Sequence, residues 1–180
     1  MPPLKHNQEG MTLVEILVVM FLFIFIATFS LNFLIMTVTG HAKAQANIEV
    51  QEHARLAMQR MVYEIRRAQA LEPSSAFDTN LALSSVDTLA LDMADADRDP
   101  TTFKVVNGIL TLKQGADPAE ELTSNDVEVT NLIFSDRSTA NGRSHNLLIN
   151  LTIKHHDPTG VDSLAVEYSL AASAELRDPN

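Results

Sequence analysis

The residue types that could do chemistry lie near the N-terminus, where a carboxylate precedes a long apolar segment. Glu15 is followed by Ile16–Val38, which is almost wholly apolar, and no charged residue occurs between Ile16 and Ala42. An ionisable side chain inside a bilayer costs several kcal/mol unless a partner neutralises it, so it indicates a function. Cleavage after Gly10 would supply a partner, because it would create a new α-amino group on Met11. The sequence therefore predicts that Glu15 pairs with the amine of Met11. The alternative is an interfacial carboxylate that stays hydrated near the cytoplasmic headgroups.

The sequence around this junction resembles the type III signal of type IV prepilins and type II secretion pseudopilins. The resemblance is carried by Glu9-Gly10-Met11-Thr12-Leu13-Val14-Glu15. In that family a prepilin peptidase in the membrane cuts after the glycine and N-methylates the new first residue. The resemblance implies that Gly10 is the cleavage position and that Met11, in place of the usual phenylalanine, is methylated. It also implies that Glu15 supports assembly with other pilin or pseudopilin subunits.

Three further similarities favour a minor subunit. Asn32 occupies a place where major pilins usually carry a helix-kinking proline. The segment from Glu49 to Arg67, with its Arg66-Arg67-Ala68 ending, resembles J-type minor pseudopilins and W-type minor pilins, and so does the tail Ala174-Glu175-Leu176-Arg177. These similarities imply a subunit of a type IV pilus-like or type II secretion filament, at or near the tip, that primes assembly.

The apolar segment also has other interpretations. At about 1.5 Å per residue it is long enough to cross a hydrocarbon core of about 30 Å. A Sec signal peptide is one alternative, because Ala42-Lys43-Ala44 and Ala44-Gln45-Ala46 offer small-residue cleavage sites. The apolar region of a signal peptide usually spans only about 7–15 residues, however. The other alternative is an uncleaved signal anchor that carries a periplasmic binding or sensor domain. Lys5 before the segment and the acidic bulk after it predict a cytoplasmic N-terminus, a single pass through the inner membrane and a periplasmic head.

A second group of candidate ligands is an acidic turn that contains Asp92, Asp95, Asp97 and Asp99. Oxygen-rich loops of this kind can hold Ca²⁺, and some pilin-like proteins bind calcium in their heads. The turn departs from the EF-hand pattern, because Pro100 follows where a glycine would be needed and no glutamate closes the loop. A solvated acidic turn is the alternative interpretation, and we expect no other cofactor.

Composition restricts the remaining function classes. Residues 73–180 contain seventeen Asp and Glu against seven Lys and Arg, and this difference of −10 accounts for the net charge of the whole chain. An acidic head repels phosphate backbones, so we expect no nucleic-acid partner. The chain has no cysteine, which excludes disulfides and thiol catalysis. No nucleophile motif, phosphate loop or zinc signature occurs, and we predict that the protein is not an enzyme.

The elements that must position these residues begin with one long helix, from the apolar segment to about Leu71. Its second half carries an apolar stripe at spacings of three and four, formed by Val50, Ala54, Met58, Met61, Ile65 and Ala68. Arg60, Glu64 and Arg67 have the spacings of ion pairs on an exposed helical face. Pro73 is expected to end the helix.

Beyond Pro73 the apolar period changes from helical to two. The sequence predicts six strands over 86–93, 103–106, 109–112, 127–134, 146–154 and 163–170. Asn107-Gly108 is a strong hairpin signal, because both residues tolerate positive φ. These patterns predict an α+β fold in which the helix packs on an antiparallel sheet, the lollipop of pilin-like subunits. The expected divisions are a leader (1–10), a transmembrane and filament-core helix (11–40), its amphipathic continuation (41–72) and a β-rich head (73–180).

Overall fold

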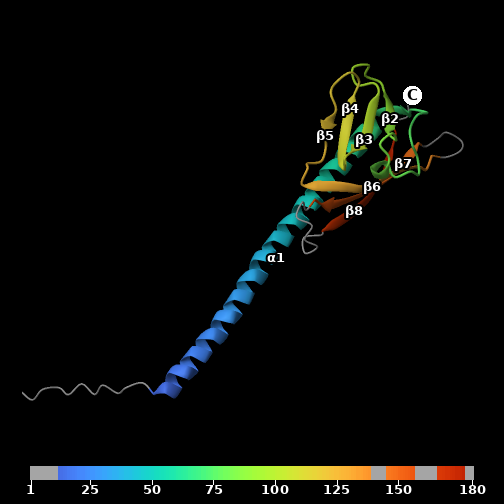
Figure 1. Ribbon diagram of the computed structural model, residues 1–180. Helices are drawn as coiled ribbons and strands as arrows, with labels where there is room; N and C mark the ends of the chain where they lie inside the picture. The colour runs from blue at the N-terminus through green and yellow to red at the C-terminus, as the bar shows by residue number, and fades with distance from the viewer. Residues whose placement is uncertain (1–11, 139–144, 157–165, 177–180) are drawn as a thin grey trace, which may run out of the picture. The chain divides into compact units, whose positions relative to one another are not determined.

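The longest element of the chain is the helix α1 (Leu13–Arg67), which is followed by antiparallel strands (Figure 1). The computed structural model describes residues 12–138, 145–156 and 166–176. By its internal contacts the chain divides into two units, Met1–His41 and Ala42–Asn180, and each is described by itself. The predicted α+β class is confirmed.

In the first unit α1 begins directly after Thr12, which caps it. The backbone N–H of Glu15 donates to the Thr12 carbonyl (3.0 Å) and to the Thr12 hydroxyl (3.3 Å). The residues from Leu13 to Thr39 include no glycine or proline, so nothing in this stretch interrupts the helix. In the described residues α1 is the one helix long and apolar enough to cross a membrane.

In the second unit α1 contributes one face to the core of the head. The predicted stripe is confirmed, because each of its residues is buried, and two alanines extend it. The buried helical residues with apolar side chains are Ala46, Val50, Ala54, Ala57, Met58, Met61 and Ile65. They form one cluster with the inward side chains of both sheets, which include Phe103 and Phe134.

The predicted end of the helix is wrong by four residues. The helix ends at Arg67, and Ala68–Leu71 form the strand β1 instead. Leu71 is paired with Leu91, and the N–H of Glu72 donates to the Ala90 carbonyl (3.0 Å). Alanine and leucine favour helices locally, but the neighbouring strand offers these residues a backbone ladder, and this tertiary pairing overrides the local preference.

The first sheet has five strands in the order β1-β2-β3-β4-β5, all antiparallel. Its other strands are β2 (Leu89–Met93), β3 (Thr101–Val106), β4 (Ile109–Gln114) and the unpredicted two-residue β5 (Glu120–Glu121). The hairpin prediction is confirmed, because Asn107 (φ 52°) and Gly108 (φ 79°) form the two-residue turn between β3 and β4.

The second sheet has three antiparallel strands in the order β6-β7-β8. Its strands are β6 (Val127–Asp136), β7 (Asn146–His155) and β8 (Glu167–Glu175). The last strand extends five residues beyond its predicted end, and the first predicted residues, 163–165, lie outside the described part. The sequence predicted one sheet where the structure has two, and it did not predict the 3₁₀ turn η1 (Leu81–Leu83) beside β6.

Candidate functional site

The predicted processing site directly precedes the described part of the chain, which begins at Thr12. Gly10 and Met11 fall outside the described residues, so the pairing of Glu15 with the Met11 amine stays a prediction. Glu15 itself is exposed in the first turn of α1. A carboxylate in the first turn interacts favourably with the helix dipole, typically by about 0.3–1 kcal/mol. This position leaves its side-chain oxygens available to a cationic partner.

The helix that follows Glu15 presents apolar side chains on all sides. Between Leu13 and Val38 the large apolar side chains are exposed by fractions from 47% at Ile16 to 79% at Leu13. Exposed apolar surface of this extent is unfavourable in water, so it marks a segment covered by lipid or by other apolar helices.

Four polar side chains within this segment donate hydrogen bonds to the helix itself. Thr28, Asn32, Thr37 and Thr39 each donate to the backbone carbonyl four residues earlier, at 2.8, 3.0, 2.8 and 2.9 Å. In hydrocarbon each unsatisfied polar group would cost several kcal/mol, so these bonds make the segment compatible with an apolar surrounding. Asn32, at the place of the proline expected in major pilins, lies within the continuous helix.

Comparison with protein families finds a match in the N-terminal segment. The family described as "Prokaryotic N-terminal methylation motif" matches residues 5–31, which include Gly10, Met11 and Glu15. No curated protein and no solved structure matches the chain. The motif indicates a type IV pilin-like or pseudopilin-like precursor, and the exposed apolar helix agrees with membrane anchoring as in prepilins.

The acidic turn has a structural role in the described residues. Asp99 Oδ1 accepts a hydrogen bond from the Met93 N–H (3.0 Å), and Asp95 Oδ1 accepts one from the Asp97 N–H (3.2 Å). Among the described residues no three His, Cys, Asp or Glu side chains are grouped to hold a metal ion, and this includes Asp92 and the other aspartates of the turn. Calcium binding stays a prediction to which the geometry adds no support.

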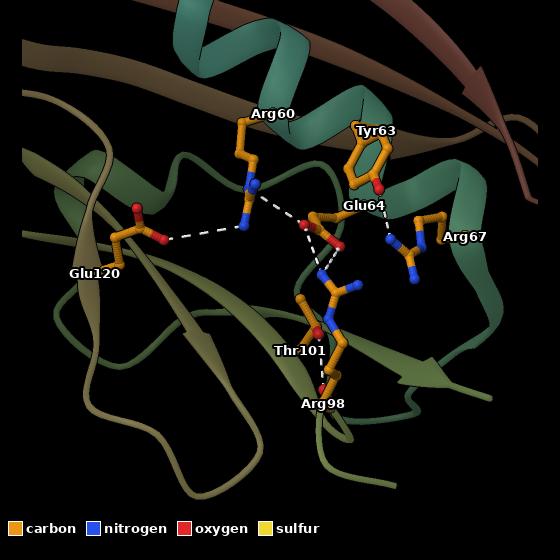
Figure 2. Close-up of polar contacts among 7 residues, drawn as sticks. All are labelled: Arg60, Tyr63, Glu64, Arg67, Arg98, Thr101 and Glu120. Atoms are coloured by element: carbon orange, nitrogen blue, oxygen red, sulfur yellow. Dashed lines mark hydrogen bonds and ion pairs between the residues drawn. The ribbon is translucent and has the colours of Figure 1, made fainter. Parts of the chain in front are cut away.

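A cluster of charged side chains around the buried Glu64 joins α1 to this turn, and it corrects the prediction of an exposed ion-pair face (Figure 2). The Glu64 side chain has no exposed surface. Arg98 Nη2 donates to both of its carboxylate oxygens, at 2.9 and 2.8 Å. Arg60 Nε lies 3.2 Å from Glu64 Oε1, and Arg60 Nη2 lies 3.9 Å from Glu120 Oε2. Glu64 therefore lies between two guanidinium groups.

Arg67, the other predicted partner of Glu64, has a different contact. It donates to the Tyr63 hydroxyl, and its guanidinium carbon lies 5.2 Å from the centre of the Tyr63 ring. Arg60 and Glu64 thus form the predicted ion pair, whereas Glu64 and Arg67 do not.

The turn that contains the aspartates places the Arg98 side chain next to α1. The Thr101 hydroxyl donates to the Arg98 carbonyl (2.8 Å), and the Arg98 N–H donates to the Asp95 carbonyl (3.0 Å). The turn also approaches Gly115, whose φ is +52° and where a Cβ would lie 2.2 Å from the Asp97 carbonyl oxygen. Glycine is therefore required at this position for the turn to pack closely.

The sequence did carry a signal for this cluster. Glu64 lies three residues after Met61 and seven after Ala57, so it falls on the buried face of α1. A buried carboxylate needs a cationic partner. Arg98 is the one basic residue within the acidic turn, and this made it the natural candidate.

Proposed function

We propose that the chain is a minor pilin or pseudopilin, cut after Gly10 by a prepilin peptidase and methylated at Met11. The observation that carries this proposal is the methylation motif over residues 5–31, continuous with a helix whose apolar side chains are exposed. Before assembly the chain spans the inner membrane once, with its N-terminus in the cytoplasm and its head in the periplasm. It then joins a type IV pilus-like or type II secretion filament as a structural subunit, not an enzyme.

In this filament Glu15 pairs with the methylated amine of Met11 on a neighbouring subunit or on its own chain. Apolar helices that pack side by side leave no water to solvate a carboxylate, so an unpaired Glu15 would oppose assembly. A pair can form only at a defined axial offset between helices, and the carboxylate therefore sets the register of the subunit.

A minor position, at or near the tip, is supported by residues outside the motif. Asn32 donates to the Thr28 carbonyl within a continuous helix, where a major pilin usually has a proline kink. The segment 49–67 and the tail resemble J-type and W-type minor subunits, which prime assembly. The partners of this chain are then sister minor subunits.

The test is the amount of this subunit in sheared filaments, compared between the unmodified chain, Glu15→Ala and the control Glu52→Ala. Glu52 is an exposed residue of α1 in the second unit. We expect Glu15→Ala to lower incorporation by more than about tenfold, because an unpaired buried amine costs more than about 1.4 kcal/mol. Glu52→Ala should incorporate normally, at few copies per filament.

Two outcomes would contradict parts of the proposal. Equal incorporation of Glu15→Ala would remove the role of the carboxylate in assembly. A copy number comparable to that of the most abundant filament protein would exclude the minor position. A chain that never enters filaments and keeps residues 1–10 would instead be a signal-anchored binding or sensor domain.

A further inference from the structure

The edges of the two sheets differ in how well they are protected from pairing with another strand. An edge strand presents unpaired backbone N–H and C=O groups, and proteins usually shorten, bulge, charge or cover such edges. In the five-stranded sheet the edge strand β5 has two residues, and β1 has four with a register shift between Ala68 and Ala70. Both edges of that sheet are therefore short.

In the three-stranded sheet the edge formed by β6 is covered by other segments. The N–H of Leu132 donates to Asn80 Oδ1 (2.9 Å), and Asn80 Nδ2 donates to the Thr130 carbonyl (3.1 Å). The N–H of Val129 donates to the Gly108 carbonyl (2.8 Å). The β6 edge is also interrupted by a register shift between Val129 and Asn131.

The opposite edge, β8, is long and regular. It pairs with β7 without a register shift from Lys154↔Glu167 to Asn146↔Glu175, and in the described residues no strand pairs with its other side. Figure 1 shows β6, β7 and β8 in the same part of the head, and β8 is hydrogen-bonded to β7 alone. With nine residues, β8 is longer than the other edge strands that no segment of the described chain covers.

The hydrogen bonds at the two ends of β8 show which of its backbone groups point away from β7. The N–H of His155 donates to the Val166 carbonyl (2.8 Å), and the N–H of Leu176 donates to the His145 carbonyl (2.9 Å). In an antiparallel pair the backbone groups of alternate residues face the partner, so the even-numbered residues bond to β7. The outward backbone groups are those of the odd-numbered residues, among them Glu167, Ser169, Ala171 and Ser173.

On the exposed face of β8 no bulky side chain lies between the terminal glutamates. The exposed side chains of Ser169, Ala171 and Ser173 are all small. On the other face Tyr168 and Leu170 contact the core but are only partly buried, so an added strand would cover apolar surface. The exposed face also has a hollow of about 370 Å³ whose lining includes Asn131, Asn150, Thr152, Ser169 and Ala171. Its amide and hydroxyl groups suit small polar side chains.

We propose that β8 binds an extended segment of a different polypeptide, which adds as an antiparallel strand to the second sheet. The segment alternates apolar residues, which cover the face of Tyr168 and Leu170, with small polar residues, and it carries basic residues at its ends. The charge of the head selects a basic partner, since residues 73–180 have a net charge of −10. A second copy of this chain is disfavoured, because antiparallel pairing centred on Ala171 would place Glu167 opposite Glu175.

The test follows backbone amide exchange of the full chain in detergent micelles, with and without a synthetic peptide. The probe is Lys-Val-Thr-Val-Thr-Val-Thr-Val-Lys, and its matched control has Glu at both ends. We expect the basic peptide to slow exchange at Ser169, Ala171 and Ser173 by at least about tenfold, and the neighbouring even-numbered amides to change little. The acidic control should bind at least about tenfold more weakly.

A backbone variant tests the same edge independently. Ala171→Pro removes an outward N–H and leaves the bonds to β7 intact, whereas the control Ala171→Ser keeps this N–H. We expect Ala171→Pro to lose peptide binding at an unchanged melting temperature and Ala171→Ser to retain it. If Ala171→Pro fails to fold, exchange in the unmodified chain still decides. The proposal is overturned if the outward amides are already protected from exchange in the free chain, or if the basic peptide protects none of them. It is also overturned if their protection rises with the concentration of the chain when no peptide is present, because the chain would then pair with itself.

Discussion

Removing the buried carboxylate of Glu64 tests how much its contacts with the arginines stabilise the packing of α1 in the head. In Glu64→Leu the side-chain volume is roughly kept, so the main change is that Arg98 and Arg60 lose the carboxylate that accepts two hydrogen bonds from Arg98 Nη2. The Arg98 side chain is only 19% exposed, and water cannot fully replace the lost partner. Breaking a buried pair by removing one member typically costs about 3–5 kcal/mol.

This cost translates into a measurable change in melting temperature. For a unit of this size about 1 kcal/mol corresponds to roughly 3 °C, so we expect Glu64→Leu to melt about 9–15 °C lower. The double variant Glu64→Leu/Arg98→Met should recover most of this loss, because apolar replacements of a whole buried pair are often nearly neutral. Arg98→Met alone should lose less than Glu64→Leu, because Arg60 Nε still lies 3.2 Å from Glu64 Oε1.

The assay is thermal unfolding of the full chain in detergent micelles, followed by circular dichroism in the region of the β-sheet signal. Arg66→Met is the matched control, because Arg66 is exposed on the same helix and belongs to no contact of the cluster described here. We expect this control to melt within about 2 °C of the unmodified chain. A Glu64→Leu variant as stable as the control would refute the buried pair, and an unrecovered double variant would refute the interpretation that the lost stability comes from the uncompensated charge.

Two further predictions concern the acidic turn. Gly115→Ala should destabilise the head by about 1–3 kcal/mol in denaturant unfolding, since the new Cβ would collide with the Asp97 carbonyl and the residue would keep a positive φ. An unchanged midpoint would show that the turn does not pack there. Adding a chelator should leave the melting temperature unchanged if the turn is held by its own bonds, in which Asp95 and Asp99 accept backbone hydrogen bonds. A calcium-dependent rise of several degrees would instead support the predicted calcium site.

The sequence predicted the elements whose evidence is local. The apolar stripe on α1 is confirmed because burial of one helical face imposes a spacing of three and four. The hairpin at Asn107-Gly108 is confirmed because few other residues tolerate positive φ at both turn positions. In both cases a few adjacent residues contain the physical reason.

The features that the sequence did not predict depend on partners far along the chain. Glu64 bonds to Arg98 across 34 residues, and helical spacing can propose only the local partners Arg60 and Arg67. Residues 68–71 become a strand because β2 is available beside them, which no local preference records. The division into two sheets likewise depends on which strands pair, whereas alternation shows only that each strand has an apolar face.

The most direct test of entry into the filament pathway is intact-mass and N-terminal analysis of the chain from cells with and without an active prepilin peptidase. We expect a chain that begins with N-methylated Met11 only when the peptidase is active. A chain that keeps Met1–Gly10 in both cells would contradict the processing and leave a signal-anchored domain. A start near Gln45 or Asn47 would contradict it differently, by showing that the apolar segment is removed as a Sec signal peptide.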